Sequence, residues 1–403
     1  MTTTKHYATI TGAYWAFTLT DGALRMLVLL HFYTLGYTAF EIALLFLLYE
    51  FFGIITNLVG GWVAARLGLR VTLLTGLCLQ VIALSVLTQF DPSWPMWIGV
   101  AYVMGAQALC GIAKDLTKMS SKTAIKMMVP HGQHGALFKW VAALTGSKNA
   151  LKGIGFFMGG MLLSAYEFDG ALMIMAGGLV LVLIASYVLL PAHIGQVTQK
   201  VKFSQILSKS RDINYLSAAR LFLFGSRDTW FVVGLPLFLA ATLDWNHTQV
   251  GAYMAAWVIA YGSVQACAPL VLKKSNHEPN GALSRRWTMA LLVVTLIITG
   301  AVWINVQPGL AVVYGLIVFG FVFAVNSALH SYLILAYSKT EHTALNVGFY
   351  YMANAAGRLT GTLLSGITYQ WGGLMMCLMV SSAFVAASWA LSFKLPNATQ
   401  SQT

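Results

Sequence analysis

The chain has 403 residues, of which 58% are hydrophobic and only 9% are charged. Because a soluble globular protein carries about 25% charged residues, this composition excludes a cytosolic enzyme, a secreted domain and a disordered regulator. A net charge of +12 suggests nucleic-acid binding in a soluble protein, but here the positions of the charges decide their meaning.

The apolar runs have the length that a membrane span requires. A hydrocarbon core about 30 Å thick takes roughly 20 helical residues to cross. Twelve spans are predicted, at about 10–33, 41–64, 71–90, 95–116, 136–163, 171–190, 214–240, 248–272, 286–305, 309–336, 343–367 and 371–394. The runs do not alternate with a period of two, which excludes a membrane β-barrel. The predicted fold class is an all-α membrane protein.

The connections between these spans alternate in charge. One set contains basic residues, at Arg66, Arg70, Lys118, Lys122, Lys126, Lys200, Lys202, Lys209, Arg211, Lys273, Lys274, Arg285 and Lys339. The other set has no lysine or arginine and consists of 34–40, 91–94, 164–170, 241–247, 306–308 and 368–370. The positive-inside rule therefore places the basic connections and both termini in the cytoplasm.

The longest polar stretch between spans divides the sequence into two halves. It predicts an N-terminal six-helix bundle over 1–190, a cytoplasmic linker over 191–213 and a C-terminal six-helix bundle over 214–403. A weak repeat agrees, because Gly160–Ser164 (GMLLS) recurs as Gly361–Ser365 (GTLLS), half a chain later. Two parallel repeats of six spans are the architecture of major facilitator transporters.

A short motif follows the second predicted span. Residues 61–70 read GWVAARLGLR. They resemble the loop signature of the major facilitator superfamily at Gly61, Arg66, Gly68 and Arg70. They differ at Ala65, where that family has an aspartate, and a gating ion pair made by that acid is not expected here.

Six cations fall within predicted spans, namely Arg25, Lys148, Lys152, Arg220, Arg227 and Arg358. Facing lipid, they would together cost on the order of 15–20 kcal/mol, so they are expected to face partners or a water-filled cavity. Three acids lie at similar depth, namely Asp21, Glu50 and Asp228. The excess of positive charge predicts a cavity that binds an anion.

Each buried charge also has a structural interpretation. Asp21 and Arg25 are one turn apart and can neutralise each other, while Glu50 can pair with Lys152. Arg227 can pair with the adjacent Asp228, and Arg220 can extend to the membrane surface.

The predicted substrate-binding residues are Arg25, Lys148, Lys152, Arg227, Asn354 and Arg358, and the proton-coupling candidates are Asp21, Glu50 and Asp228. Lys114 and Lys118 belong to a helical stripe of lysines and are expected to attract an anion from the cytoplasm. Cysteines 78, 110, 267 and 377 are scattered, so neither a metal site nor a cofactor is predicted.

Two stretches resemble one family more specifically. Ala113–Lys122 (AKDLTKMSSK) and Asn214–Asp228 (NYLSAARLFLFGSRD) are similar to the organoarsenical efflux permeases of arsenic-resistance operons, the ArsJ family. The resemblance implies a multi-pass protein of the bacterial inner membrane that exports 1-arseno-3-phosphoglycerate. It also implies a functional link to the glyceraldehyde-3-phosphate dehydrogenase that makes this ester. The family assigns no residue roles, so the candidates above rest on depth and charge alone.

Other functions stay open. An exporter or exchanger of another organophosphate fits the same charges, whereas the cationic ligands of a proton-coupled drug exporter conflict with them. A non-transporting receptor or scaffold has little use for buried cations. The sequence contains no nucleotide-binding loop and no nucleophile with its base, so an enzyme is not predicted. The expected partners are the lipid bilayer and a small anion, not nucleic acid.

Overall fold

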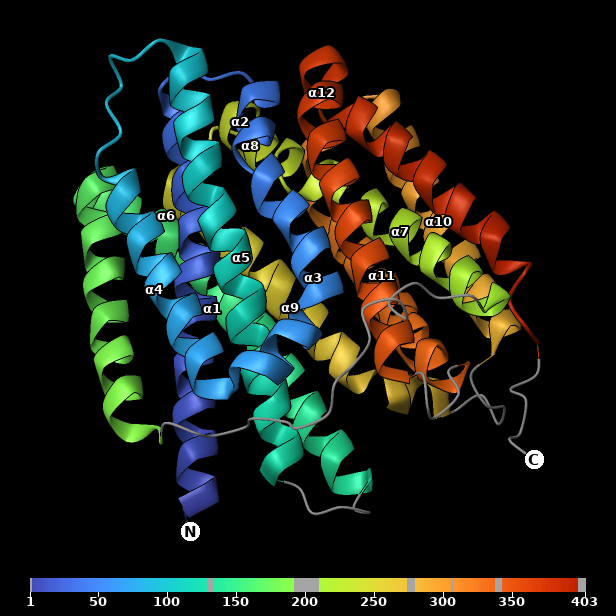
Figure 1. Ribbon diagram of the computed structural model, residues 1–403. Helices are drawn as coiled ribbons and strands as arrows, with labels where there is room; N and C mark the ends of the chain where they lie inside the picture. The colour runs from blue at the N-terminus through green and yellow to red at the C-terminus, as the bar shows by residue number, and fades with distance from the viewer. Residues whose placement is uncertain are drawn as a thin grey trace. The chain divides into compact units, whose positions relative to one another are not determined.

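The computed structural model describes residues 2–128, 134–191, 210–273, 280–305, 307–337 and 343–397. These residues form helices and connections, without a strand (Figure 1). The helices are α1 Thr2–Thr34, α2 Ala39–Leu45, α3 Leu47–Leu67, α4 Leu69–Leu87, α5 Met96–Met128, α6 His134–Leu189, α7 Arg211–Phe231, α8 Gly234–Ala241, α9 His247–Lys273, α10 Gly281–Trp303, α11 Pro308–Ala336 and α12 Thr343–Ser392. The predicted all-α fold class is confirmed.

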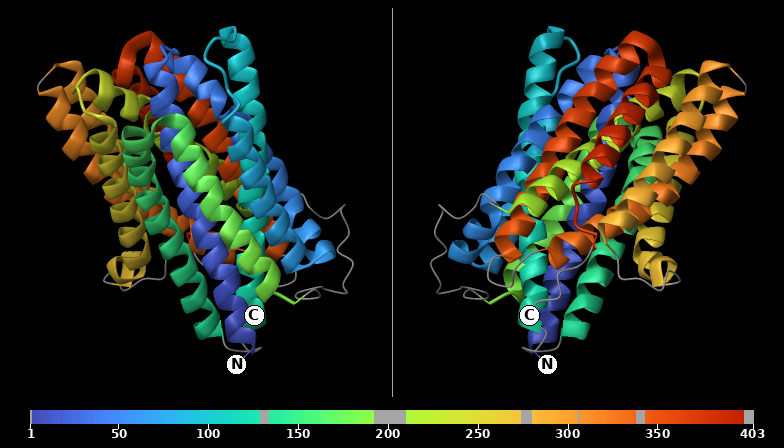
Figure 2. Two further views of the ribbon diagram at one scale, coloured as in Figure 1. Left: turned by 90° about the vertical axis from the view of Figure 1, so that its left-hand side faces the viewer. Right: turned by 90° about the vertical axis from the view of Figure 1, so that its right-hand side faces the viewer.

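Nine helical stretches of the described chain are long and apolar enough to cross a bilayer. Two of them, Gly146–Leu189 and Asn346–Ser392, have 44 and 47 residues, enough for two crossings each. Each long helix is interrupted near a predicted connection, at Glu167 in α6 and at Gly372 and Gly373 in α12. Figure 2 shows each as two arms joined end to end. These nine stretches have the length for eleven crossings and do not include α1, so the count of twelve stays a prediction.

Two predicted spans are broken where continuous helices were expected. The span predicted at 214–240 ends as α7 at Phe231 and resumes as α8 at Gly234. Pro236 explains this break, because proline has no N–H to donate to the carbonyl of Val232 and its ring clashes with that turn. The Ser365 hydroxyl accepts hydrogen bonds from the Val233 and Gly234 amides at 3.3 and 3.1 Å. The span predicted at 41–64 is likewise split between α2 and α3, and no residue type marks that break.

The chain forms two compact units. Unit 1 consists of Met1–Gly36, Leu48–Phe203 and Asn246–Ile259. Unit 2 consists of Tyr37–Leu47, Ser204–Trp245 and Ala260–Thr403. The domain boundaries at 190 and 214 stay a prediction, and most of the predicted linker, 192–209, lies outside the described residues.

Glycines bring two helix pairs into backbone contact. In unit 1, a Cβ on Gly155 or Gly159 of α6 would overlap the backbone of α1 at Leu19 and Ala23. In unit 2, a Cβ on Gly357 of α12 would overlap the Leu221 carbonyl oxygen of α7, and one on Gly361 would lie 2.6 Å from the Gly225 oxygen. Small residues allow such close approach between membrane helices.

This packing corrects the register of the sequence repeat. Gly361 packs against α7, but Gly160 packs against the beginning of α9, where a Cβ would overlap the His247 carbonyl oxygen. The residue of unit 1 that packs as Gly361 does is Gly159, one position earlier. The five-letter match therefore identified the correct helices but placed them one residue out of register.

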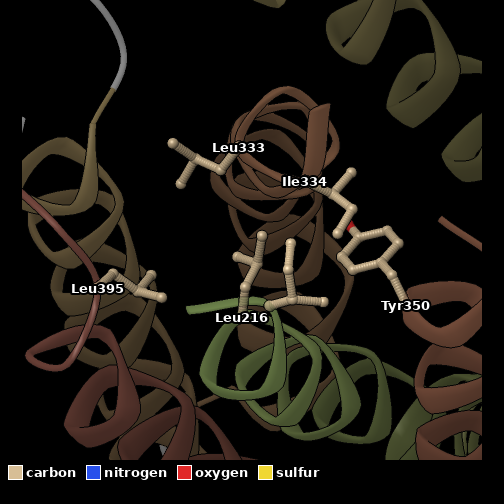
Figure 3. Close-up of a cluster of buried hydrophobic side chains, with 6 residues drawn as sticks. Leu216, Leu333, Ile334, Tyr350 and Leu395 are labelled. Carbon is tan, nitrogen blue, oxygen red and sulfur yellow. The ribbon is translucent and has the colours of Figure 1, made fainter. Parts of the chain in front are cut away.

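Unit 2 has a buried apolar cluster that supports the base of α7. Ile213 and Leu216 of α7 pack with Leu333 and Ile334 of α11, with Tyr350 of α12 and with Leu395 (Figure 3). The cluster fixes the relative positions of α7, α11 and α12, the three helices that carry Arg220, Ser327 and Arg358.

Candidate functional site

Unit 1 contains a buried ion pair between α1 and α3. The Arg25 Nη2 atom donates to the Glu50 Oε1 atom at 2.7 Å, and the Glu50 side chain is 1% exposed. Asp21 pairs with Tyr49 rather than with Arg25, because the Tyr49 hydroxyl donates to its two oxygens at 2.7 and 3.0 Å. Spacing along one helix suggested the Asp21–Arg25 pair, but the fully buried Glu50 draws the guanidinium toward α3.

Tyr49 connects the charged residues of unit 1, and the sequence analysis did not select it. The Lys114 Nζ atom lies 3.9 Å from the centroid of its ring, and the Arg25 Cζ atom lies 5.1 Å from it. Cations are attracted to the face of an aromatic ring. Four predicted site residues, Asp21, Arg25, Glu50 and Lys114, are thus brought together around or beside one tyrosine. Its position next to Glu50 in an apolar run was the available signal.

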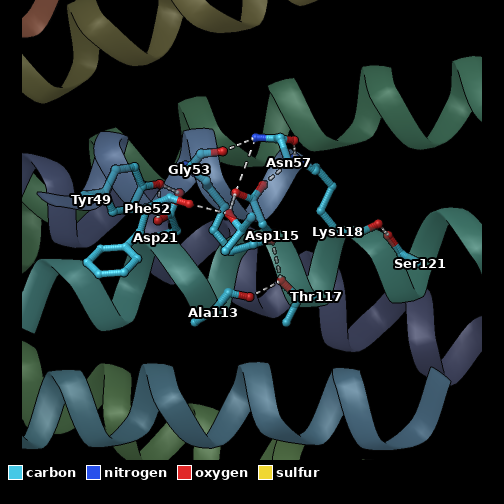
Figure 4. A network of polar contacts seen from close by, with 12 residues as sticks. Asp21, Tyr49, Phe52, Gly53, Asn57, Ala113, Asp115, Thr117, Lys118 and Ser121 are labelled. Atoms are coloured by element: carbon cyan, nitrogen blue, oxygen red, sulfur yellow. Dashed lines mark hydrogen bonds and ion pairs between the residues drawn. The ribbon is translucent and has the colours of Figure 1, made fainter. Parts of the chain in front are cut away.

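A second network lies between α3 and α5 (Figure 4). Buried Asp115 forms an ion pair with Lys118 and accepts hydrogen bonds from the Thr56 hydroxyl and, at 3.4 Å, from the Asn57 amide. Lys118 also donates to the Asn57 oxygen at 2.6 Å. Both lysines expected to attract an anion therefore contact groups of unit 1, Lys118 at Asp115 and Lys114 at Tyr49. Their role in anion entry stays a prediction.

Lys148 and Lys152 are partly buried on the arm of α6 that packs against α1. The Lys152 Nζ atom lies 5.6 Å from the centroid of the Phe156 ring. The backbone carbonyl of Lys152 meets α1 at Gly22, where a Cβ would lie only 2.7 Å from it. Gly22 directly follows Asp21, so Lys152 is anchored on α6 beside the part of α1 that carries the acid.

Unit 2 has one buried acid that contacts two arginines. The Asp228 side chain is 1% exposed, and its Oδ1 atom accepts from Arg227 Nε at 2.6 Å. Its Oδ2 atom accepts from Arg358 Nε of α12 at 3.2 Å. The predicted Arg227–Asp228 pair is confirmed. The contact with Arg358 was not predicted, because it joins residues 130 positions apart and no spacing within one helix indicates it.

Arg220 is the functional candidate that the sequence analysis left out of the site. It is 4% exposed, so extension to the membrane surface is wrong. Its Nε atom donates to Asn354 Oδ1 at 2.9 Å and its Nη1 atom donates to the Ser327 carbonyl oxygen at 3.0 Å. Asn354, predicted to bind substrate, therefore holds an arginine. The seven-residue spacing between Arg220 and Arg227 was the signal that placed both on one face.

The charges of unit 2 do not balance among the described buried residues. Arg227 and Arg358 both contact the Asp228 carboxylate. Arg220, in contrast, contacts no carboxylate among the described residues. The charge of Arg220 is therefore not balanced by a described acid. Because a buried ion is expensive unless it is paired, this excess favours an anion as the missing partner.

The structure describes the side chains of only part of the loop motif at residues 61–70. Gly68 has a φ of 80°, in the region that glycine adopts without strain, and it begins α4. Arg70 donates to the Tyr187 carbonyl oxygen at 2.8 Å and lies over the ring of that tyrosine. The side chains of Gly61–Leu67, including Arg66, lie outside those that the structure describes. Within the described part of the chain, no group of histidines, cysteines and acids has the arrangement of a metal site.

The Arg25–Glu50 pair gives a stability prediction. Glu50→Ala is expected to destabilise unit 1 by about 3–5 kcal/mol, because it leaves a buried guanidinium without its acid. The double variant Arg25→Met with Glu50→Leu is expected to recover most of this loss, since it removes both charges and retains volume. Thermal unfolding of the purified proteins in one detergent measures both. Equal unfolding temperatures for the single variant and the wild type would contradict the structural importance of the pair.

Comparison with known proteins gives a family match and two close folds. The model of the Major Facilitator Superfamily matches residues 10–362. A crystal structure of a POT family transporter in complex with 5-aminolevulinic acid superposes with a TM-score of 0.76 at 12% identity, covering 95% of this chain and 94% of that one. A mutant of the nucleoside transporter NupG gives a TM-score of 0.71 at 16% identity, covering 98% of each chain. No curated protein matches the sequence. At these identities the likeness is one of fold.

Proposed function

The chain belongs to the Major Facilitator Superfamily and is a multi-pass membrane transporter, and on this basis we propose that it exports a small organic anion, 1-arseno-3-phosphoglycerate. The ester carries a phosphate at one end and an arsenate at the other. Its export from the cytoplasm across a bacterial inner membrane, with both termini cytoplasmic, would confer resistance to arsenate. A glyceraldehyde-3-phosphate dehydrogenase would supply it.

The single observation that best supports an anionic substrate is the charge imbalance among the described residues of unit 2. Arg227 and Arg358 contact one buried carboxylate, Asp228. The buried Arg220 contacts no carboxylate among the described residues. Arginine binds phosphate and similar oxyanions with two parallel hydrogen bonds, and such charge-assisted bonds are strong when water is excluded. A phosphate ester carries about −1.5 to −2 charges at neutral pH, so it can supply the missing counter-charge.

Unit 1 supports the same substrate class in a different way. Arg25 and Lys114 flank Tyr49, and Lys148 and Lys152 repeat one turn apart on α6. Like charges at that spacing repel each other, and an anion beside them would reduce this repulsion. Lysine provides a mobile point charge, so this unit offers a different kind of contact from the arginines of unit 2.

The proposal of this specific ester as substrate rests on the similarity of Ala113–Lys122 and Asn214–Asp228 to the arsenate-ester permeases. The contacts of these stretches fit a functional role, because the first contains the Asp115–Lys118 pair and the second contains Arg220, Arg227 and Asp228. Arsenate is a pentavalent oxyanion that needs charge and hydrogen bonds rather than thiolates. The four cysteines are all free, and the buried Cys110 and Cys377 lie in different units.

Asp21 is our candidate for proton coupling. Glu50 and Asp228 each form an ion pair with an arginine. The partner of Asp21 is instead the Tyr49 hydroxyl, which donates to both of its oxygens. Export of an anion with a proton in exchange requires a titratable acid.

Co-expression in an arsenic-sensitive bacterium tests the function. The protein together with a suitable glyceraldehyde-3-phosphate dehydrogenase is expected to raise tolerance to arsenate and not to arsenite, because only arsenate forms the ester. Dehydrogenase alone and transporter alone are the controls. Uptake of the ester by inverted vesicles, detected by mass spectrometry with and without a pH gradient, measures transport directly. Equal protection against arsenite without the dehydrogenase would reject this substrate.

A further inference from the structure

Arg220 is held in unit 2 by neutral groups on every side that the structure describes. Its guanidinium carbon lies 3.9 Å from the centroid of the Phe224 ring and 5.0 Å from that of Tyr350. Its two hydrogen bonds go to the Asn354 side-chain oxygen and to the Ser327 carbonyl oxygen. These contacts orient the guanidinium plane and do not neutralise its charge.

The guanidinium has more donors than these acceptors use. Arginine carries five N–H groups in a planar fork, and two of them are used by Asn354 and Ser327. Among the described residues no carboxylate contacts Arg220, because Asp228, the acid of the same helix, is occupied by Arg227 and Arg358. An anion that joined this buried cation would supply a counter-charge and use its spare donors.

The surrounding residues are fixed independently of the arginine. Ser327 accepts hydrogen bonds through its hydroxyl from Tyr261 at 3.3 Å and from Gln265 at 3.1 Å, both on α9. Tyr350 belongs to the apolar cluster at the base of α7. The guanidinium is therefore preorganised by α7, α9, α11 and α12, which lowers the entropy lost when a ligand binds.

We propose that Arg220 is the residue of unit 2 that binds a phosphate-class oxyanion of the transported molecule, with Asn354 as its positioning residue. The inference rests on the proposed function and deepens it, because it assigns one anionic end of the substrate to a residue outside the Asp228 ion pairs. Arg227 and Arg358 share their charge with Asp228, whereas Arg220 has its full charge available.

Binding to the purified full-length protein tests this assignment apart from transport. Isothermal titration with inorganic phosphate, 3-phosphoglycerate and neutral glycerol is performed on the wild type and on Arg220→Gln, Arg220→Lys and Arg211→Gln. Arg211 is the matched control, since it is an exposed arginine at the beginning of the same helix. Nanodiscs with zwitterionic and with anionic lipid distinguish a soluble oxyanion from a lipid headgroup.

We expect Arg220→Gln to weaken binding of both phosphate compounds roughly ten- to a hundredfold, as the loss of one charge-assisted contact implies. Arg211→Gln is expected to bind as the wild type does, and glycerol is expected not to bind. Arg220→Lys keeps the buried positive charge, so it remains testable if the glutamine variant does not fold. It is expected to bind about tenfold more weakly, because the planar fork is lost.

Unchanged affinity in Arg220→Lys or in folded Arg220→Gln overturns the inference and leaves the export proposal intact. Phosphate binding by the wild type in zwitterionic but not in anionic nanodiscs also overturns it, since an anionic lipid headgroup would then occupy the site. Arg220-dependent phosphate binding by a protein that does not transport the arsenate ester supports the inference and rejects the proposed substrate.

Discussion

Arg358→Ala is expected to abolish export while the protein stays folded and inserted. The Arg358 side chain is 18% exposed, and Asp228 keeps Arg227 as its partner when Arg358 is removed. The buried acid is therefore not orphaned, and the cost to folding is small. Loss of one charge-assisted contact to an anion costs about 1.5–3 kcal/mol, or roughly ten- to a hundredfold in affinity. A transporter also needs its ligand to favour one conformation, so the loss carries over to the rate of export.

Ester uptake into inverted vesicles measures the effect, with the amount of folded protein checked by size-exclusion chromatography. Arg211→Ala is the control on an exposed arginine, and wild-type uptake is expected from it. Lys152→Ala is the corresponding change in unit 1, with exposed Lys5→Ala as its control, and it is expected to give the same loss. Wild-type export by folded Arg358→Ala would exclude this arginine from the substrate pathway.

Gly357→Leu is expected to have a large effect on folding. A Cβ at this position already overlaps the carbonyl oxygen of Leu221, and a backbone atom in a helix cannot move aside as a side chain can. Overpacking typically costs 1–3 kcal/mol and occasionally more, and here we expect about 3 kcal/mol or more because two helix backbones must separate. The yield of monodisperse protein and its unfolding temperature in detergent are the measurements.

Gly300→Leu is the matched control, because no atom lies within 4 Å of a Cβ built at that position of α10. It places the same side chain in the same unit without overlap. The two variants should differ sharply in yield. Equal unfolding temperatures for them would show that the close approach of α7 and α12 is not required for stability.

Hydropathy predicted where the helices lie, because the cost of burying backbone and charge in lipid depends on one segment at a time. The breaks within the predicted spans and the partners of the buried charges depend on several segments at once. Pro236 is a residue that interrupts helices, but the apolar run continues through it. Hydropathy therefore predicted one continuous span and missed the end of α7 before this proline. The Asp21–Arg25 spacing suggested a pair within one helix, while the actual partners, Tyr49 and Glu50, come from a neighbouring one.

The burial of Arg220 also could not be predicted from its own helix. Its position near the end of a predicted span favoured exposure, but it is buried in contact with the Ser327 carbonyl of α11 and the Asn354 side chain of α12. In contrast, the Arg227–Asp228 pair was predicted correctly because both residues are adjacent. Contacts between neighbours in sequence could be anticipated, and contacts between helices far apart in sequence could not.

The chain segments that make up each unit have a consequence for biosynthesis. Unit 1 includes Asn246–Ile259, and unit 2 includes Tyr37–Leu47. A ribosome that has completed the first half of the chain has therefore not yet made every segment that unit 1 contains, although domains usually fold in the order of their synthesis. Likewise, helix α2 is synthesised early, whereas the residues of α12 that it packs against in unit 2 are synthesised near the end of the chain. Fragments cut within 191–213 should consequently be degraded when produced singly and should accumulate only when both are produced in the same cell.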